Sequence, residues 1–268
     1  MLEMQTCFLS EVGGRSRNED ACGYWTSETG CCWVVSDGAG GHGSGDVAAR
    51  LVVSSMLRSF SAHPQVGPNT ASSLLQRAND AVVEEKTTGG TADDMHATAV
   101  LLLIDPHDRV AVWGHVGDTR IYLFRHGRVA YQTRDHSLVQ NMIDAGYGSV
   151  DMLRTHPQRS LLTSAIGSAE SIALSVSAEP LALHPGDVFL MCTDGWWEYV
   201  EEDDMERLLN STPTPQAWLE SMSELIRSRA SESNDNFTAV CVSMIEEPDA
   251  DETTVIIPSK RRLEGEPD

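Results

Sequence analysis

The sequence lacks the features of a secreted, membrane-bound or nucleic-acid-binding protein. No uninterrupted apolar run approaches the roughly 18 residues of a membrane helix, and the N-terminus has no basic segment followed by a long apolar core. Basic residues are few, since 19 Lys and Arg against 40 Asp and Glu give a net charge of −21 over 268 residues. Such a surface repels nucleic-acid phosphates and anionic lipid. We therefore expect a soluble cytoplasmic protein that binds neither nucleic acid nor membrane.

Several catalytic motifs are also absent. The six cysteines form no CxxC pair, and most of them lie inside apolar runs, so we expect reduced core thiols rather than a disulfide framework. No cysteine has an arginine six residues later, which excludes a Cys-x5-Arg phosphatase loop. GxxxxGK[ST], HExxH and GxSxG do not occur, which removes P-loop, zincin and serine-hydrolase interpretations.

What the sequence does contain is a repeated acid at the end of apolar runs. Asp37-Gly38 and Asp194-Gly195 each follow a predicted buried strand, and a third apolar stretch ends in Gly117-Asp118. A strand end is rigid, and glycine lets the backbone turn sharply and approach a ligand closely. Several such acids that meet in space would hold hard divalent cations.

The periodicity predicts an α+β fold, a β-sandwich of two mainly antiparallel sheets flanked by helices. Alternating or apolar runs predict strands, and three- and four-residue spacings predict helices from Asp46 and from Leu74 and a third capped by Thr214. The strands are expected at 5–12, 21–27, 31–36, in a meander over 96–132, and at 171–178, 187–192 and 237–244. We predict one domain over residues 1–246, with an inserted flap at about 134–168 that contains a helix near 138–145, and a disordered tail at 247–268.

Six acids lie in turns that border predicted strands rather than on polar helix faces. They are Glu19, Asp20, Asp37, Asp118, Asp194 and Asp235. Two carboxylates about 4 Å apart repel by about 4 kcal/mol at an intermediate effective dielectric, so a shared site requires cations. A dinuclear centre would bridge and activate a water for in-line attack on phosphorus. The alternative is a set of separate, solvated turn acids, because Asp is common in turns.

The loop after Asp37 contains a formal GxGxxG at Gly38, Gly40 and Gly43, so a dinucleotide site has to be considered. Two features argue against it. The following helix leads into a second helix, with no strand that carries a ribose-binding acid about 20 residues on. Asp37 itself would oppose a pyrophosphate.

Taken in order, seven motifs resemble those of bacterial PP2C-type (PPM) serine/threonine phosphatases over roughly residues 5–245. They are Arg15-x-x-Asn18-Glu19-Asp20, Asp37-Gly38-Ala39-Gly40-Gly41-His42, GlyAspThrArg at 117–120, ThrArgAspHisSer at 133–137, LeuThrSerAlaIleGly at 162–167, CysThrAspGly at 192–195 and Asp235-Asn236. The resemblance implies the PP2C β-sandwich and Mn²⁺- or Mg²⁺-dependent hydrolysis of phosphoserine and phosphothreonine by a metal-activated water, without a phosphoenzyme.

The resemblance also assigns roles to individual residues, with two or three ions expected. Asp37 corresponds to the carboxylate that bridges two metals, Gly38 offers a backbone carbonyl, and Asp194 and Asp235 complete the first site. Asp20 and Glu19 match acids that orient metal-bound waters, and Asp118 matches the acid of a third metal. Arg15 matches the guanidinium that holds the substrate phosphate. His42 resembles a loop histidine that protonates the leaving alkoxide; its alternative is a loop histidine bound to water or a carboxylate.

Departures from the family pattern are few. Thr119 stands where serine is common, Ala39 replaces a frequent methionine, and Trp196-Trp197 is bulkier than the usual apolar pair. None of them removes a metal ligand, so we predict catalysis rather than a non-catalytic phosphoprotein-binding module of the same fold. A hydrolase of small phosphate esters is a second alternative. His96, His115 and His136 are expected to be structural.

The tail suggests a partner. Ile stands at the third position after both Thr253 and Thr254, which resembles phosphothreonine sequences that FHA domains bind. A serine/threonine kinase that the phosphatase opposes could mark these residues for recruitment by an FHA-domain protein, and the alternative is an unmodified tail.

Overall fold

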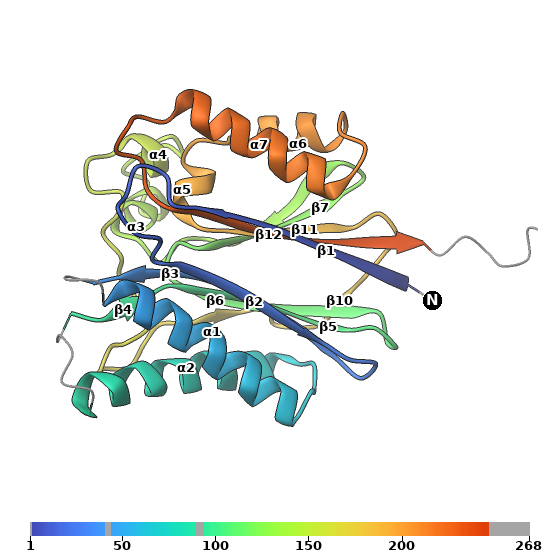
Figure 1. The fold of residues 1–268 in the computed structure, drawn as a ribbon, viewed down its shortest axis with the longest axis horizontal. Helices are drawn as coiled ribbons and strands as arrows, with labels where there is room; N and C mark the ends of the chain where they lie inside the picture. Colours follow the sequence, from blue (N-terminus) through green and yellow to red (C-terminus); the bar gives the residue numbers. More distant parts are fainter. Residues whose placement is uncertain (1, 41–43, 89–93, 247–268) are drawn as a thin grey trace, which may run out of the picture.

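The chain folds into two antiparallel β-sheets that pack face to face, with helices on both outer faces (Figure 1). The computed structural model describes residues 2–40, 44–88 and 94–246. Three buried apolar clusters follow from the layers, one between the sheets and one beneath the helices on each side. The α+β sandwich predicted from the sequence is confirmed.

The first sheet brings the two ends of the domain together. Its strands run in the spatial order β1-β12-β11-β7-β8. Their bounds are β1 Leu2–Glu11, β7 Arg120–Arg125, β8 Arg128–Gln132, β11 Val188–Cys192 and β12 Phe237–Glu246. β1 pairs with β12 along its whole length, from Leu2 opposite Glu246 to Glu11 opposite Phe237. This pairing places the segments that follow β1 and precede β12 at one end of the sandwich.

The second sheet has the main path β10-β6-β5-β3-β2, with β9 paired to β6 and β4 to β3. The bounds are β2 Asp20–Thr26, β3 Cys31–Ala39, β4 His96–Ala97, β5 Ala99–Asp105, β6 Val110–Val116, β9 Ser175–Val176 and β10 Leu181–Ala182. Along β3, Cys32 and Val34 face the helix-side core, whereas Trp33 and Val35 face the core between the sheets. Successive side chains point to opposite faces of a strand, so a strand in the middle layer is apolar throughout.

The helices form the two outer layers (Figure 1). Their bounds are α1 Gly45–Ala62, α2 Pro68–Thr88, α3 Leu138–Asp144, α4 Met152–Thr155, α5 Asp194–Trp197, α6 Glu202–Leu209 and α7 Pro215–Arg229. α1 and α2 cover the second sheet, and α6 and α7 cover the first. As predicted, Thr214 caps α7 by accepting a hydrogen bond from the backbone N–H of Ala217 at 3.2 Å. None of these helices, within the ranges that the structure describes, has the length and apolar character that a membrane crossing needs.

The structure differs from the predicted secondary structure in one strand and in several short helices. The strand expected at 171–178 is limited to Ser175–Val176, because Ile172 and Leu174 fill the core beneath α1 and α2 without forming a ladder. The short helices α4, α5 and α6 were not predicted. α6 has three acids in its first turn, Glu202, Asp203 and Asp204, which is a helix-start signal in the sequence. The helix expected near 138–145 is confirmed as α3.

Candidate metal centre

Strand register brings Asp20 and Asp37 together. In the β2–β3 pair, Asp20 lies directly opposite Asp37. The hydroxyl of Thr193, the residue before α5, donates to Asp20 Oδ2 at 3.0 Å. Because Asp20 belongs to the second sheet and Thr193 follows β11 of the first, this bond joins the two sheets at the end where their acids lie.

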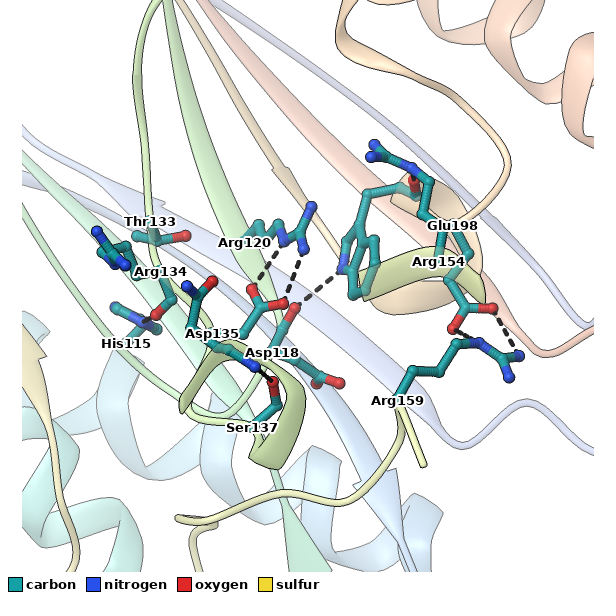
Figure 2. A network of polar contacts seen from close by, with 12 residues as sticks. His115, Asp118, Arg120, Thr133, Arg134, Asp135, Ser137, Arg154, Arg159 and Glu198 are labelled. Carbon is teal, nitrogen blue, oxygen red and sulfur yellow. Dashed lines mark hydrogen bonds and ion pairs between the residues drawn. The ribbon is translucent and has the colours of Figure 1, made fainter. Parts of the chain in front are cut away.

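The neighbouring strands β11, β7 and β12 bring in three more acids. Cys192 of β11 lies opposite Arg120 of β7 and Ala239 of β12. Asp194 follows Cys192 by two residues, and Asp118 precedes Arg120 by two, so antiparallel pairing places both acids at the same end. Asp235 precedes β12 at that end too. The indole Nε1 of Trp197 donates to the Asp118 carbonyl oxygen at 2.9 Å, which links α5 to the Gly117-Asp118 turn. Figure 2 shows Asp118 among the neighbouring polar residues.

Asn236 fixes the loop that leads from β1 to the acids. Its Nδ2 donates to the carbonyl oxygens of Val12 at 2.7 Å and Arg17 at 2.8 Å, and its Oδ1 accepts from the Glu19 N–H at 2.8 Å. The residue is 5% exposed. One buried side chain therefore holds the loop between β1 and β2 against the start of β12.

We expect Asn236→Ala to destabilise the protein by about 1–3 kcal/mol, because it removes three part-buried hydrogen bonds to the backbone. The exposed Asn141, whose side chain makes no hydrogen bond within the described residues, supplies the control Asn141→Ala. Urea unfolding of both variants measures the difference. Equal midpoints for the two variants would contradict this role of Asn236.

The gathered carboxyl groups have raised pKa values. Burial raises the pKa of Asp37 well above its ordinary range, and the charges of Asp20, Asp194, Asp118 and Asp235 add to the shift. Asp37 is half-buried as a residue, and its carboxyl group is enclosed. Burial is also the largest cause for Asp194, followed by the charge of Asp118. The electrostatic coupling indicates that these side chains share one environment.

Two further acids of the set have pKa values near neutrality. Burial raises the pKa of Asp20 to about 7, against hydrogen bonds from Thr238 and Thr193 that lower it. Burial and then the charge of Asp135 raise the pKa of Asp118 to about 7. Without a compensating cation, ionisation of this set is unfavourable.

The donor set fits hard divalent cations, which prefer carboxylate and carbonyl oxygens. Asp194 Oδ1 is buried and has no hydrogen-bond partner among the described residues. A Cβ at Gly38 would lie 2.0 Å from the carbonyl oxygen of Gly45 and 2.8 Å from that of Glu19, so only glycine allows this close backbone approach. Within residues 2–40, 44–88 and 94–246, no group of three His, Cys, Asp or Glu side chains has a geometry that could hold an ion. Metal binding here therefore remains a prediction that donor chemistry and the unpaired oxygen support.

Arg15 lies at the mouth of this centre. Its Nη2 donates to Asp235 Oδ2 at 2.6 Å, and its side chain is 56% exposed. A cleft of about 410 Å³ opens beside it, lined by Arg15, Ser16, Arg17, Glu19, Gly40, Asp235 and Asn236. One terminal nitrogen of the guanidinium is held by Asp235, and the side chain is largely exposed to solvent. Its other N–H groups can therefore bind a phosphate that enters from solvent.

Asp46, in the first turn of α1, was missed by the sequence analysis. Its charge helps to raise the pKa of Glu19, after the larger effect of burial. Asp46 Oδ2 pairs with Arg50 at 3.0 Å, and Oδ1 is buried without a partner among the described residues. Its position directly after the glycine-rich loop, at a helix start, was the available signal.

The remaining predicted residues divide into two groups. His42 lies outside the described residues, so its role as a general acid stays a prediction. His115 and His136 stack with ring centroids 4.6 Å apart; His115 Nε2 bonds the Arg134 carbonyl oxygen, and His136 Nδ1 accepts from the Gly117 N–H. These contacts favour the structural role expected for both. All six cysteines are free thiols, as expected.

The chain is similar to known proteins over most of its length. PhpP, a protein phosphatase of Streptococcus pneumoniae, is 27% identical over 264 residues, which cover 91% of this chain and 99% of PhpP. The solved structure of PppA from Pseudomonas aeruginosa is 30% identical and covers 90% of this chain and 98% of PppA, with a TM-score of 0.72.

A third similar structure is the catalytic domain of the serine/threonine protein phosphatase PstP, solved in complex with two manganese ions. It has a TM-score of 0.76 and 24% identity and covers 92% of this chain and all of that domain, and at this identity it supports the fold alone. The family model described as protein phosphatase 2C matches residues 10–239. Since that match spans most of the sequence, the chain belongs to the protein phosphatase 2C family.

Proposed function

We propose that this chain is a metal-dependent protein phosphatase that hydrolyses phosphoserine and phosphothreonine in proteins. The observation that carries the proposal is the family match over residues 10–239, combined with a buried acid set in which Asp194 Oδ1 lacks a partner among the described residues. PhpP, a protein phosphatase, is a precedent for the activity. The non-catalytic alternative is not favoured, because every acid of the expected metal set is present.

The proposed ligands are Asp37, the Gly38 carbonyl, Asp194 and Asp235, with Asp20, Glu19 and Asp118 in supporting positions. Bound Mn²⁺ or Mg²⁺ would supply a water of lowered pKa and offset phosphoryl charge. Asp20 and Glu19 would accept protons or hydrogen bonds at the cleft, and Arg15 would orient the phosphate there. Cys22, Cys32 and Cys192 are not suited to act as nucleophiles, because burial raises the pKa of their thiols. Direct attack by water, without a phosphoenzyme, follows from this proposal.

Phosphate release from matched phosphothreonine, phosphoserine and phosphotyrosine peptides, across Mn²⁺ and Mg²⁺ titrations and after EDTA, tests the function. We expect release from the first two peptides only with metal. Equal rates after EDTA would overturn the mechanism. Tight peptide binding without release would favour the phosphoprotein-binding alternative, and faster turnover of small phosphate esters would favour the metabolite hydrolase.

Arg15→Ala is expected to lower kcat/KM on phosphopeptides by about 10- to 100-fold, because the bidentate phosphate contact is lost. Arg15→Lys should recover little of this loss, since an ammonium group cannot form the planar fork. Arg58→Ala, on the exposed face of α1, is the control. Retention of the wild-type kcat/KM by Arg15→Ala would remove its assigned role.

We further propose that the protein is cytoplasmic and that it opposes a serine/threonine kinase. We also propose that residues 134–168 act as a flap inserted between core strands. Free thiols at all six cysteines are compatible with a reducing compartment. Recruitment of an FHA-domain protein by phosphorylated Thr253 or Thr254 belongs to the same proposal, and both residues lie outside the described ranges. Absence of phosphate on either threonine after co-expression with a partner kinase, measured by mass spectrometry, would count against it.

A further inference from the structure

Trp197 connects two acids of the proposed metal centre. It is the last residue of α5, the helix that begins with Asp194, and its indole N–H donates to the carbonyl oxygen of Asp118 at 2.9 Å. Trp197 is 2% exposed and Asp118 is 5% exposed. The backbone therefore fixes Asp194 relative to the indole, and the hydrogen bond fixes Asp118 relative to the same indole.

The indole ring is itself held by buried charged groups. The Arg120 guanidinium lies over the ring, with Cζ 3.5 Å from the centroid. Arg120 is 1% exposed, and its Nε and Nη2 donate to the two carboxylate oxygens of Asp135 at 2.8 and 2.7 Å. The bidentate pair of Arg120 and Asp135, shown in Figure 2, fixes the orientation of the guanidinium. The guanidinium in turn restricts the orientation of the Trp197 ring beneath it.

A second contact holds the backbone of Trp197. Its carbonyl oxygen accepts from Arg154 Nε at 3.0 Å, and Arg154 Nη2 donates to Glu202 of α6. The turn at Asp118 is also restricted, because Gly117 has a φ of +95° and lies against Thr98. The Asp118 turn, the Trp197 ring and α5 are therefore each restricted. As a result, the indole N–H of Trp197 points at the Asp118 carbonyl oxygen.

We propose that Trp197 is a positioning residue for Asp118, holding the Asp118 turn at a set place relative to Asp194. The inference rests on the proposed function, since it assumes that both acids serve the metal centre. Asp118 can bind a cation only if its carboxylate points toward the metal centre. The carbonyl that accepts the indole N–H belongs to the backbone of Asp118 itself. Loss of the indole N–H releases that unit, and the carboxylate then spends less time in the direction that binds a cation.

The adjacent Trp196 gives a matched control. It is 0% exposed, and its Nε1 has no hydrogen-bond partner among the described residues. Trp197→Phe and Trp196→Phe therefore make the same chemical change in neighbouring buried positions, but only the first removes a hydrogen bond to Asp118. Any general cost of shrinking a buried indole is shared by both variants.

The test measures Mn²⁺ binding by equilibrium dialysis together with the Mn²⁺ dependence of phosphopeptide turnover. We expect Trp197→Phe to raise the half-saturating Mn²⁺ concentration of the weakest site by about five- to tenfold, the effect of one lost hydrogen bond, and Trp196→Phe to change it less than twofold. In an Asp118→Asn background, Trp197→Phe should cause no further change, because the two act through one group. Equal effects of the two Trp variants, or an undiminished Trp197→Phe effect in the Asp118→Asn background, would overturn the proposal.

A measurement on the wild-type chain covers the case in which Trp197→Phe does not fold. In ¹⁵N-indole NMR spectra, the Trp197 N–H, assigned through its contacts with Arg120, should shift on Mg²⁺ addition, and it should not shift in Asp118→Asn. An unshifted Trp197 signal in a wild-type chain that binds Mg²⁺ would overturn the inference. A wild-type chain without metal-dependent turnover would instead contradict the proposed function, so the two failures are distinguishable.

Discussion

Asp37→Asn is expected to reduce phosphopeptide hydrolysis by about a thousand-fold or more, while the metal-free variant becomes harder to unfold than metal-free wild type. The loss follows from Asp37's proposed place between two cations, where a neutral amide cannot replace a bridging carboxylate. The gain in stability follows from the raised pKa of Asp37, which burial and the charges of four neighbouring acids cause. An amide of the same shape removes a buried charge, and we expect about 1–3 kcal/mol of stabilisation.

The opposite signs of these two effects make the prediction specific. Most substitutions that abolish activity through misfolding also lower the melting temperature. Asp80→Asn, on the exposed side of α2, is the matched control and should leave both quantities unchanged. Thermal melts in EDTA and turnover in Mn²⁺ provide the two measurements. Turnover within tenfold of wild type in Asp37→Asn would contradict the central role of this residue.

Much of the fold was predictable because its signals are local. The Thr214 cap of α7 and the continuous apolar run of β3 each depend on a few consecutive residues. The strand predicted at 171–178 is too long for a related reason. Alternation of apolar and polar residues indicates which side chains are buried, and Ile172 is buried without strand pairing. Apolar pattern alone cannot distinguish a core side chain on irregular backbone from one on a ladder.

The candidate site depended on longer-range information. The sequence predicts each acid at a strand end. Asp118 and Asp194 lie close together because β7 and β11 are neighbours in the sheet, and local sequence patterns do not predict which strands are neighbours. The resemblance to a family supplied that step. The Asp118–Trp197 hydrogen bond could not be predicted, because it joins residues 79 apart in the sequence through a backbone carbonyl. Side-chain-to-backbone contacts of this kind leave no residue-type signature at the acceptor.

The metal-free protein is expected to lose about 2 kcal/mol or more of unfolding free energy between pH 6.5 and pH 8.5. Burial raises the folded-state pKa of Asp20 and of Asp118 to about 7, whereas unfolded carboxyls titrate near pH 4. Over this pH range the folded state binds more protons than the unfolded state, so stability falls as pH rises through the folded pKa. Each group with a pKa near 7 contributes about 1 kcal/mol over the window, and Asp37 and Asp194 add to the effect.

The buried histidines act in the opposite direction, and mainly at lower pH. Burial lowers the pKa of His136 to about 4 and also lowers that of His115, so protonation of the unfolded state reduces stability below about pH 6.5. Above that pH the two histidines contribute less than the acids, so the net change in stability follows the acids. Saturating Mg²⁺ or Mn²⁺ should raise the unfolding free energy and remove the decline, since cations favour the ionised carboxylates. Urea midpoints in EDTA and in Mg²⁺ at several pH values test this, with Asp118→Asn as a variant that should flatten the EDTA curve. A metal-free stability that is constant or rises over the window would mean that the acids are not gathered in one buried centre.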